Sequence, residues 1–193
     1  MGLFSKLFGQ KNQDEKAQSV TDKSFADKQP DVKTYENVVH QIVVSESLQT
    51  DLKLKLKQAF EDPRSFYDEN DEFILSDRGL TFPDDALLTP KFVLIDTLQD
   101  QDQMAEIDWK EDEGEIRFAI NRIMKVKNYT TLSEELKYDS LDTSEVLAKI
   151  NDDELKPMDY SLEILDIDSD SYVFTAVPLE KHHEVAALFL KLK

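Results

Sequence analysis

The segment most informative about the fold is "YSLEILDIDSDSYVFTAVP", residues 160–178. It contains two runs rich in isoleucine, valine, tyrosine and phenylalanine, at 160–167 and 172–178, and "DSDS" joins them. Such residues favour strands, whereas aspartate and serine side chains cap the backbone amides of turns. The segment therefore predicts two strands connected by a hairpin turn.

The same turn raises the question of a metal site. Asp166, Asp168 and Asp170 occupy alternate positions, as at the start of a calcium loop of the EF-hand type. That loop requires glycine at its sixth position and a bidentate glutamate at its twelfth. Counted from Asp166, these positions hold Ser171 and Val177. We therefore expect a turn, with a weak metal site at the three aspartates as the alternative.

Toward the N-terminus, hydrophobic spacing predicts two helices. Apolar residues recur at helical spacing over 34–46, and Ser47 is of the residue type that caps a helix over 48–60. Leu52, Leu54 and Leu56 also alternate with polar residues, so a strand is the alternative for that stretch.

The middle of the chain predicts a helix, a short strand and a second helix. Pro90 suits the first turn of a helix that continues through Leu98, with a buried strand over 91–98 as the alternative. Residues 103–109 alternate between polar and apolar side chains, which is typical of a strand. Apolar residues down one face of 111–129 predict an amphipathic helix.

Two more helices are expected, over 142–152 and at the C-terminal end over 179–193. Strands that are interleaved with helices late in the chain favour an α+β fold, with a small antiparallel sheet and several helices packed against it. We expect one such domain over residues 34–193.

Residues 1–33 differ from the rest of the chain. The stretch 10–33 is polar, with few and aperiodic apolar residues, and predicts a disordered, flexible tail. In front of it, four apolar side chains would share one face of a short helix. These are Leu3, Phe4, Leu7 and Phe8. Because two helical turns are unstable alone in water, they would fold only against a membrane surface, a partner or the body of the protein itself.

The net charge of −18 limits the classes of partner. A strongly acidic body repels nucleic acid phosphates and lacks the basic stripe that binding them requires. It attracts basic protein surfaces instead, and the alternative is that the acidity simply maintains solubility. We therefore expect a protein partner and no nucleic acid.

The absence of cysteine excludes disulfides, thiolate zinc sites and thiol catalysis. A run of about 18 apolar residues, as needed to span a membrane, does not occur in the sequence. The N-terminal "MGLFSKLFGQ" lacks the apolar core and cleavage site of a signal peptide, so a cytoplasmic location is expected.

Two stretches resemble a known family. They are "IDWKED" at 107–112, which precedes an amphipathic helix, and "LEILDIDSDSYVFTAV" at 162–177, which precedes the C-terminal helix. Together they resemble the domain of unknown function 6630, over about residues 35–193. The resemblance implies a bacterial cytoplasmic protein, and it supplies no activity and no catalytic residues.

Motifs for catalysis or metal binding are weak. Glu180 and His183 form one Glu-x-x-His pair, and Glu36 and His40 could complete a mixed site, but di-iron bundles need two such pairs and two further glutamates. The sequence has no G-x-S-x-G motif and too few glycines for a phosphate-binding loop. We therefore predict no catalytic residue and no cofactor.

The sole tryptophan lies among acidic residues. One interpretation is an aromatic anchor for a basic partner, with Asp108, Trp109, Glu111, Asp112 and Glu113 as the binding residues. The interpretation we favour is that Trp109 packs into the core and that the acids support the start of the following helix. The whole acidic cluster comprises Asp100, Asp102, Glu106, Asp108, Glu111, Asp112, Glu113 and Glu115.

Three functional hypotheses follow. The favoured one is a non-catalytic protein-interaction domain with an acidic surface, including the subtype of an immunity-type protein or an inhibitor. The first alternative is an enzyme with a carboxylate-based, metal-dependent site. The second is a peripheral membrane adaptor that uses the N-terminal segment for weak association with a membrane surface.

Overall fold

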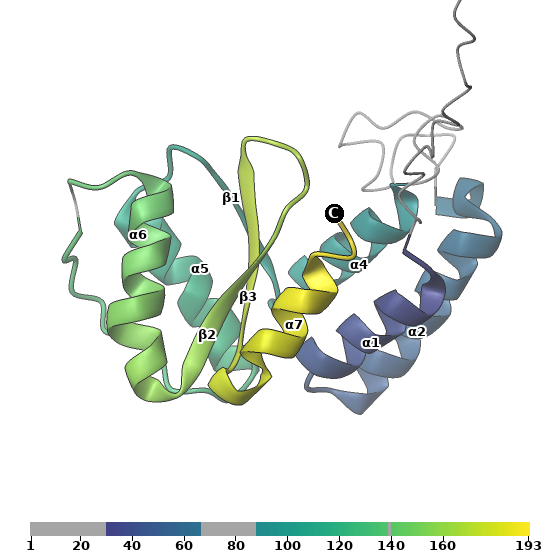
Figure 1. Ribbon diagram of the computed structural model, residues 1–193, viewed down its shortest axis with the longest axis horizontal. Helices are drawn as coiled ribbons and strands as arrows, with labels where there is room; N and C mark the ends of the chain where they lie inside the picture. The colour runs from purple at the N-terminus through teal and green to yellow at the C-terminus, as the bar shows by residue number, and fades with distance from the viewer. Residues whose placement is uncertain (1–29, 67–87, 139) are drawn as a thin grey trace, which may run out of the picture.

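A small antiparallel sheet forms the centre of the molecule. The computed structural model describes residues 30–66, 88–138 and 140–193. The predicted hairpin is present: β2 (Tyr160–Leu165) and β3 (Ser171–Pro178) run antiparallel and lie side by side (Figure 1). β1 (Ala105–Asp108) pairs with the other edge of β3, so the strand order is β1–β3–β2. The last of these strands in the chain is therefore the central one.

Helices cover both faces of this sheet (Figure 1). One face carries α1 (Val32–Ile42), α2 (Glu46–Glu61), α4 (Thr89–Gln99) and α7 (His182–Phe189). The other face carries α5 (Glu113–Val126) and α6 (Thr143–Lys149). Shorter helical turns are η1 (Pro63–Phe66), η2 (Ile150–Leu155), η3 (Lys156–Met158) and η4 (Leu179–Lys181). The predicted α+β fold is confirmed.

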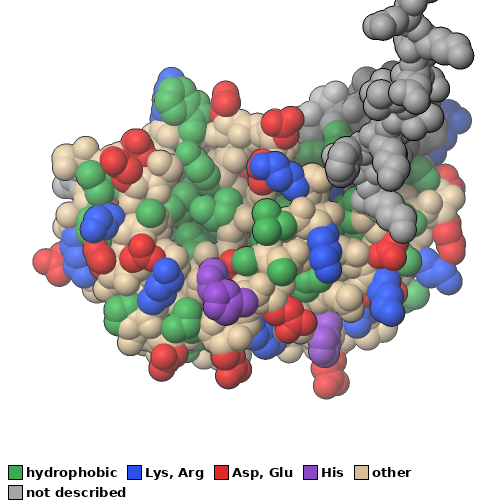
Figure 2. Space-filling view, viewed as in Figure 1, with side chains coloured by type: hydrophobic (Ala, Val, Ile, Leu, Met, Phe, Trp, Pro, Cys, Tyr) green, Lys and Arg blue, Asp and Glu red, His purple; other side chains and the backbone are tan. Residues whose placement is uncertain are grey.

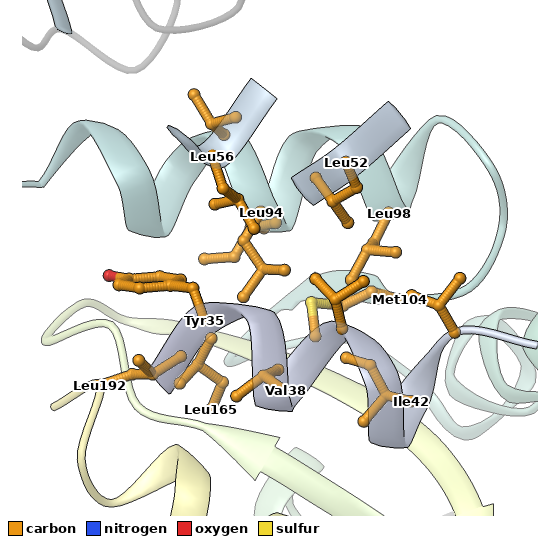
Figure 3. Packing of buried hydrophobic residues seen from close by; sticks show 14 of the residues in the cluster. Tyr35, Val38, Ile42, Leu52, Leu56, Leu94, Leu98, Met104, Leu165 and Leu192 are labelled. Carbon is orange, nitrogen blue, oxygen red and sulfur yellow. The ribbon is translucent and has the colours of Figure 1, made fainter. Parts of the chain in front are cut away.

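The core is divided into two hydrophobic clusters, one on each face of the sheet. Successive strand residues point to opposite faces. Val173 and Val177 of β3 therefore join the cluster beneath α1, α2, α4 and α7. Phe174 and Ala176 join the cluster beneath α5 and α6. Figure 3 shows the first cluster, in which side chains of α1 point toward those of α2 and α4.

The leucine-rich stretch at 48–60 is part of a helix, as predicted. Leu52 and Leu56 are buried, whereas Leu54 is 65% exposed, which is the pattern of one helical face rather than of a strand. The predicted N-cap is wrong by two residues. The hydroxyl of Ser45, not that of Ser47, accepts the hydrogen bond from the backbone N–H of Leu48, and α2 begins at Glu46.

Other boundaries also differ slightly from the prediction. α1 begins at Val32 rather than at residue 34, because the carboxylate of Asp31 caps it by accepting from the backbone N–H of Thr34. The stretch that begins at Pro90 is helical, so its alternative as a buried strand is wrong. The predicted N-terminal tail lies outside the described residues, apart from its last few positions.

Candidate functional site

Trp109 occupies a turn at the end of β1 and is 49% exposed. The expectation that it packs into the core is wrong, because the chain turns at this point: the backbone N–H of Glu111 donates to the carbonyl of Asp108. The hydroxyl of Thr143, at the start of α6, donates to the carbonyls of Trp109 (2.7 Å) and Glu111 (3.0 Å). The turn is thereby fixed with the indole at the surface, where the ammonium of Lys110 lies 4.3 Å from the ring centroid.

Beside this turn is a hollow of about 280 Å³ that runs along β1, between α5 and the end of α4. We call it the acidic hollow, because five carboxylates and one guanidinium line it. The carboxylates are Asp102, Glu106, Asp108, Glu111 and Glu115. The guanidinium is that of Arg122, which forms an ion pair with Asp102. Apolar side chains, among them Ile107 and Phe118, complete its walls. Carboxylates gathered in a concave site focus a negative potential, so the hollow attracts cationic groups.

The structure brings together only part of the predicted binding set. Asp108 and Glu111 line the acidic hollow, and Trp109 lies on the adjoining turn. Asp112 is the N-cap of α5, with its carboxylate accepting from the backbone N–H of Glu115 at 3.0 Å. Glu113 is buried and belongs to another arrangement. Phe118 and Arg122 also line the hollow and were not predicted from the sequence, although their positions three and seven residues after Glu115 place all three on one helical face.

Glu113 is the centre of a buried network and therefore does not belong to the exposed acidic surface. Its carboxylate accepts hydrogen bonds from the backbone N–H groups of Lys137 and Tyr138. It also accepts from Arg117, at 2.7 Å, and Arg117 donates in turn to Glu154, at 2.6 Å. Burial alone would raise the pKa of Glu113, but these hydrogen bonds and the charge of Arg117 outweigh burial and lower it. The network joins α5, the segment before α6 and η2.

Lys127 is a buried cation just after the end of α5. Its ammonium donates to the hydroxyl of Thr175 at 2.7 Å and to the carbonyl of Ala176 at 2.9 Å. Burial, and to a smaller extent the charge of Lys181, lowers the pKa of Lys127 to about 7. Its position at the C-terminal end of a helix favours the charged form, but only partly compensates for the loss of water.

A serine, a histidine and a glutamate meet near the start of α7, but not in the geometry of a hydrolytic triad. The carboxylate of Glu163 lies 2.5 Å from Nδ1 of His182, and the hydroxyl of Ser161 lies 3.3 Å from that same nitrogen. A triad needs the acid and the nucleophile on different ring nitrogens. Ser161 is also fully buried, whereas histidine side chains reach the surface in Figure 2. The contact therefore anchors α7 to β2.

The aspartate-rich turn is stabilised by its own side chains and by Lys193. One oxygen of Asp166 accepts from the backbone N–H of Asp168 at 2.9 Å, and the other lies 2.5 Å from the ammonium of Lys193. The side chain of Asp170 is exposed. The hydrogen bonds and the charge of Lys193 lower the pKa of Asp166.

The other candidate metal ligands are not brought together. Glu180 lies in η4 and His183 in α7, while Glu36 and His40 lie in α1. Within residues 30–66, 88–138 and 140–193, no group of three or more histidine, aspartate or glutamate side chains is placed to hold a metal ion.

Two further predictions concern membranes. The four apolar residues proposed as a membrane or partner contact, Leu3, Phe4, Leu7 and Phe8, lie outside the described residues. In the part of the chain that the structure describes, none of the helices has both the length and the apolar character needed to cross a bilayer.

Comparison with known proteins agrees with the resemblance found in the sequence. Neither a curated protein nor a solved structure matches the chain. A family model for a domain of unknown function, DUF6630, matches residues 42–193. The match covers most of the chain and includes the acidic hollow, the sheet and the described helices except α1, of which only Ile42 is matched. This chain belongs to the family of the domain of unknown function 6630.

Proposed function

We propose that this chain is a non-catalytic interaction protein of the bacterial cytoplasm, and that its acidic hollow binds a basic surface of another protein. An immunity-type protein or an inhibitor of a basic partner is the subtype that this chemistry suits best. The observation that carries the proposal is the gathering of five carboxylates, all within residues 102–115, around one hollow.

Three features of the hollow support this role. Its one guanidinium, that of Arg122, is already paired with Asp102, which leaves a large excess of negative charge. Its charges are clustered. A clustered set of charges still attracts a partner at physiological salt, where the Debye length is about 8 Å. Thr143 fixes the turn at Trp109 beside the hollow, so an exposed aromatic side chain lies next to the acids, where a partner can contact it.

The test is a charge reversal at the hollow. Asp108, Glu111 and Glu115 are each replaced by lysine in the full chain. Glu113 is left intact, because reversing it would disrupt the buried network rather than the surface. The matched control reverses three exposed acids outside the hollow, which are Asp170, Glu180 and Glu184. Both triple variants change the net charge from −18 to −12, so any difference between them comes from position rather than from total charge.

The wild-type chain and both variants are immobilised and used to capture partners from the native cell, and the association rates of a captured protein are then measured. We expect a basic protein that binds the wild type and the control, binds the hollow variant poorly, and associates more slowly as salt rises. A partner that associates equally fast with all three chains, whatever the salt concentration, would contradict the proposal. Circular dichroism and urea unfolding check that both variants are folded.

A further inference from the structure

A second hollow lies on the other side of Phe118 and Arg122. We call it the apolar hollow; its volume is about 480 Å³, and the exposed face of α5 and the segment 131–136 enclose it. Leu132 is buried at this site, whereas Phe118 is 60% exposed and Leu136 is 50% exposed. Apolar surface predominates in its lining, although the charged side chains of Arg122, Lys125 and Glu134 also border it. Volumes of a few hundred Å³ with mainly apolar walls are typical of sites that accept a side chain or a small ligand.

The walls of the apolar hollow are held in place by hydrogen bonds. Glu113, Arg117 and Asn121 follow one another at intervals of four residues and therefore lie along one side of α5. The amide of Asn121 donates to the carbonyl of Leu132 (3.2 Å) and accepts from its N–H (2.8 Å). Arg117 donates to the carbonyl of Ser133, and Glu113 accepts from the backbone N–H of Lys137, just beyond the segment 131–136. The segment is thus fixed against α5, and the hollow is a built feature of the fold.

The two hollows adjoin each other, because Phe118 and Arg122 line both of them. The guanidinium of Arg122 also lies over the ring of Phe118, 5.8 Å from its centroid. Glu115 and Phe118 are three residues apart on α5, which corresponds to roughly 4.5 Å along the helix axis. A partner that contacts an acid at Glu115 therefore reaches the apolar hollow within a few residues of its own chain.

We propose that the basic partner of the acidic hollow inserts a large apolar side chain into the apolar hollow. This inference rests on the proposed function, and it specifies the chemistry of the partner: lysine or arginine within about four residues of a leucine, methionine, phenylalanine or tryptophan. Charge argues against other occupants of the paired hollows. A second copy of this chain also carries −18, and an anionic membrane surface would meet the same five carboxylates.

The test uses a random library of short peptides displayed on phage and selected against the full chain. Selection is repeated against three variants: Phe118→Ser, the pair Glu111→Gln and Glu115→Gln, and Leu54→Ser as a control. Leu54 is an apolar residue on α2 with a similar exposure, 65%. The affinities of the selected peptides are measured by fluorescence polarisation, and urea unfolding checks the fold of each variant.

We expect selected peptides to combine basic and large apolar residues. Their affinity should fall roughly tenfold or more in Phe118→Ser, because the apolar contact is lost. It should also fall in the glutamine variant and stay unchanged in Leu54→Ser. Loss in the glutamine variant alone would overturn this inference and leave the proposed function standing. Peptides that bind all variants equally, or a library with no peptide that prefers the wild type, would overturn both. Self-association of the wild type that Phe118→Ser abolishes would assign the hollow to a second copy and overturn the inference.

Discussion

At the scale of single residues, two buried ionisable groups have different hydrogen-bond partners. The carboxylate of Glu113 is surrounded by donors, including the guanidinium of Arg117. The ammonium of Lys127 donates to two neutral acceptors, and the charge of Lys181 repels it. The lowered pKa of Glu113 favours its charged form, whereas the lowered pKa of Lys127 favours its neutral form. The charge on Glu113 should therefore stabilise the fold, whereas a charge on Lys127 should destabilise it.

Replacing Glu113 with glutamine should destabilise the protein by about 3–5 kcal/mol, because Arg117 loses a charged partner while it remains buried. The free energy of unfolding in urea at pH 7 measures this. Glu135→Gln is the control, since Glu135 is exposed and should change stability by less than about 0.5 kcal/mol. Equal effects of the two substitutions would show that the network does not stabilise the fold.

The same carboxylate should contribute to acid sensitivity. Its pKa is lower in the folded than in the unfolded chain, so its stabilising effect is complete above the ordinary carboxylate pKa of about 4.3. The effect is lost as the pH falls through the lower folded value. Urea titrations between pH 7 and pH 3 should therefore show a shallower decline in stability for Glu113→Gln than for the wild type, and an identical decline would contradict this assignment.

Lys127 should make stability rise with pH in a second, alkaline range. Its pKa is about 7 in the folded chain and about 10.4 when unfolded, so the unfolded chain binds more protons between these values. The stability contributed by this group therefore rises with pH from about 7 to 10 and is constant below that window. Lys127→Met should remove the rise, whereas Lys125→Met, at an exposed position, should retain it. Unfolding curves at pH 6, 8 and 10 measure the slope, and a slope that persists in Lys127→Met would show that another group causes it.

At the scale of secondary-structure elements, the hairpin turn depends on a residue in the left-handed region. Asp168 has φ 56°, a conformation that costs most residues about 1–2 kcal/mol but that aspartate and glycine tolerate well. Asp168→Gly should leave the thermal unfolding midpoint unchanged or raise it slightly. Asp168→Val should lower stability by about 1–2 kcal/mol, because a β-branched side chain clashes in this region. If both variants unfold at the same temperature, the turn does not have this conformation in solution.

Most of the elements could be predicted from local patterns, and the errors have local causes. The spacing of Leu52 and Leu56 identified the helix α2. Its predicted cap was Ser47, whereas the cap in the structure is Ser45, two residues earlier. Alternation along β1 implied that Trp109 would face inward, whereas the chain turns one residue earlier. The π-helical turn η2 had no recognisable signal, because its sequence is that of an ordinary helix end.

At the scale of the whole molecule, only part of the candidate site could be predicted. The acids of the acidic hollow are close in sequence, so their clustering was visible before the structure. The burial of Glu113 was not, because it depends on a segment more than twenty residues further along the chain. The apolar hollow could not be predicted for the same reason: it exists only where residues 131–136 meet α5.

The N-terminal boundary of the folded body can be tested by truncation. A chain that begins at Pro30 keeps the cap at Asp31 and the buried Tyr35, and it should have the same free energy of unfolding as the full chain. A chain that begins at Asn37 loses both, and should be less stable by about 1 kcal/mol for the cap and about 3–5 kcal/mol for the aromatic side chain. A large loss on removing only residues 1–29 would show that the predicted tail contributes to the fold.

The central position of β3 has a consequence for the synthesis of the protein. Both hydrophobic clusters need this strand: Val173 and Val177 complete one, and Phe174 and Ala176 complete the other. Because β3 is the last strand of this sheet to be synthesised, the helices made before it emerge with no complete sheet to pack against. The nascent chain must therefore remain without a finished core until residues 171–178 have been made. A ribosome stalled before residue 171 should display a chain that proteases digest and chaperones bind, and adding the remaining residues should protect both faces together.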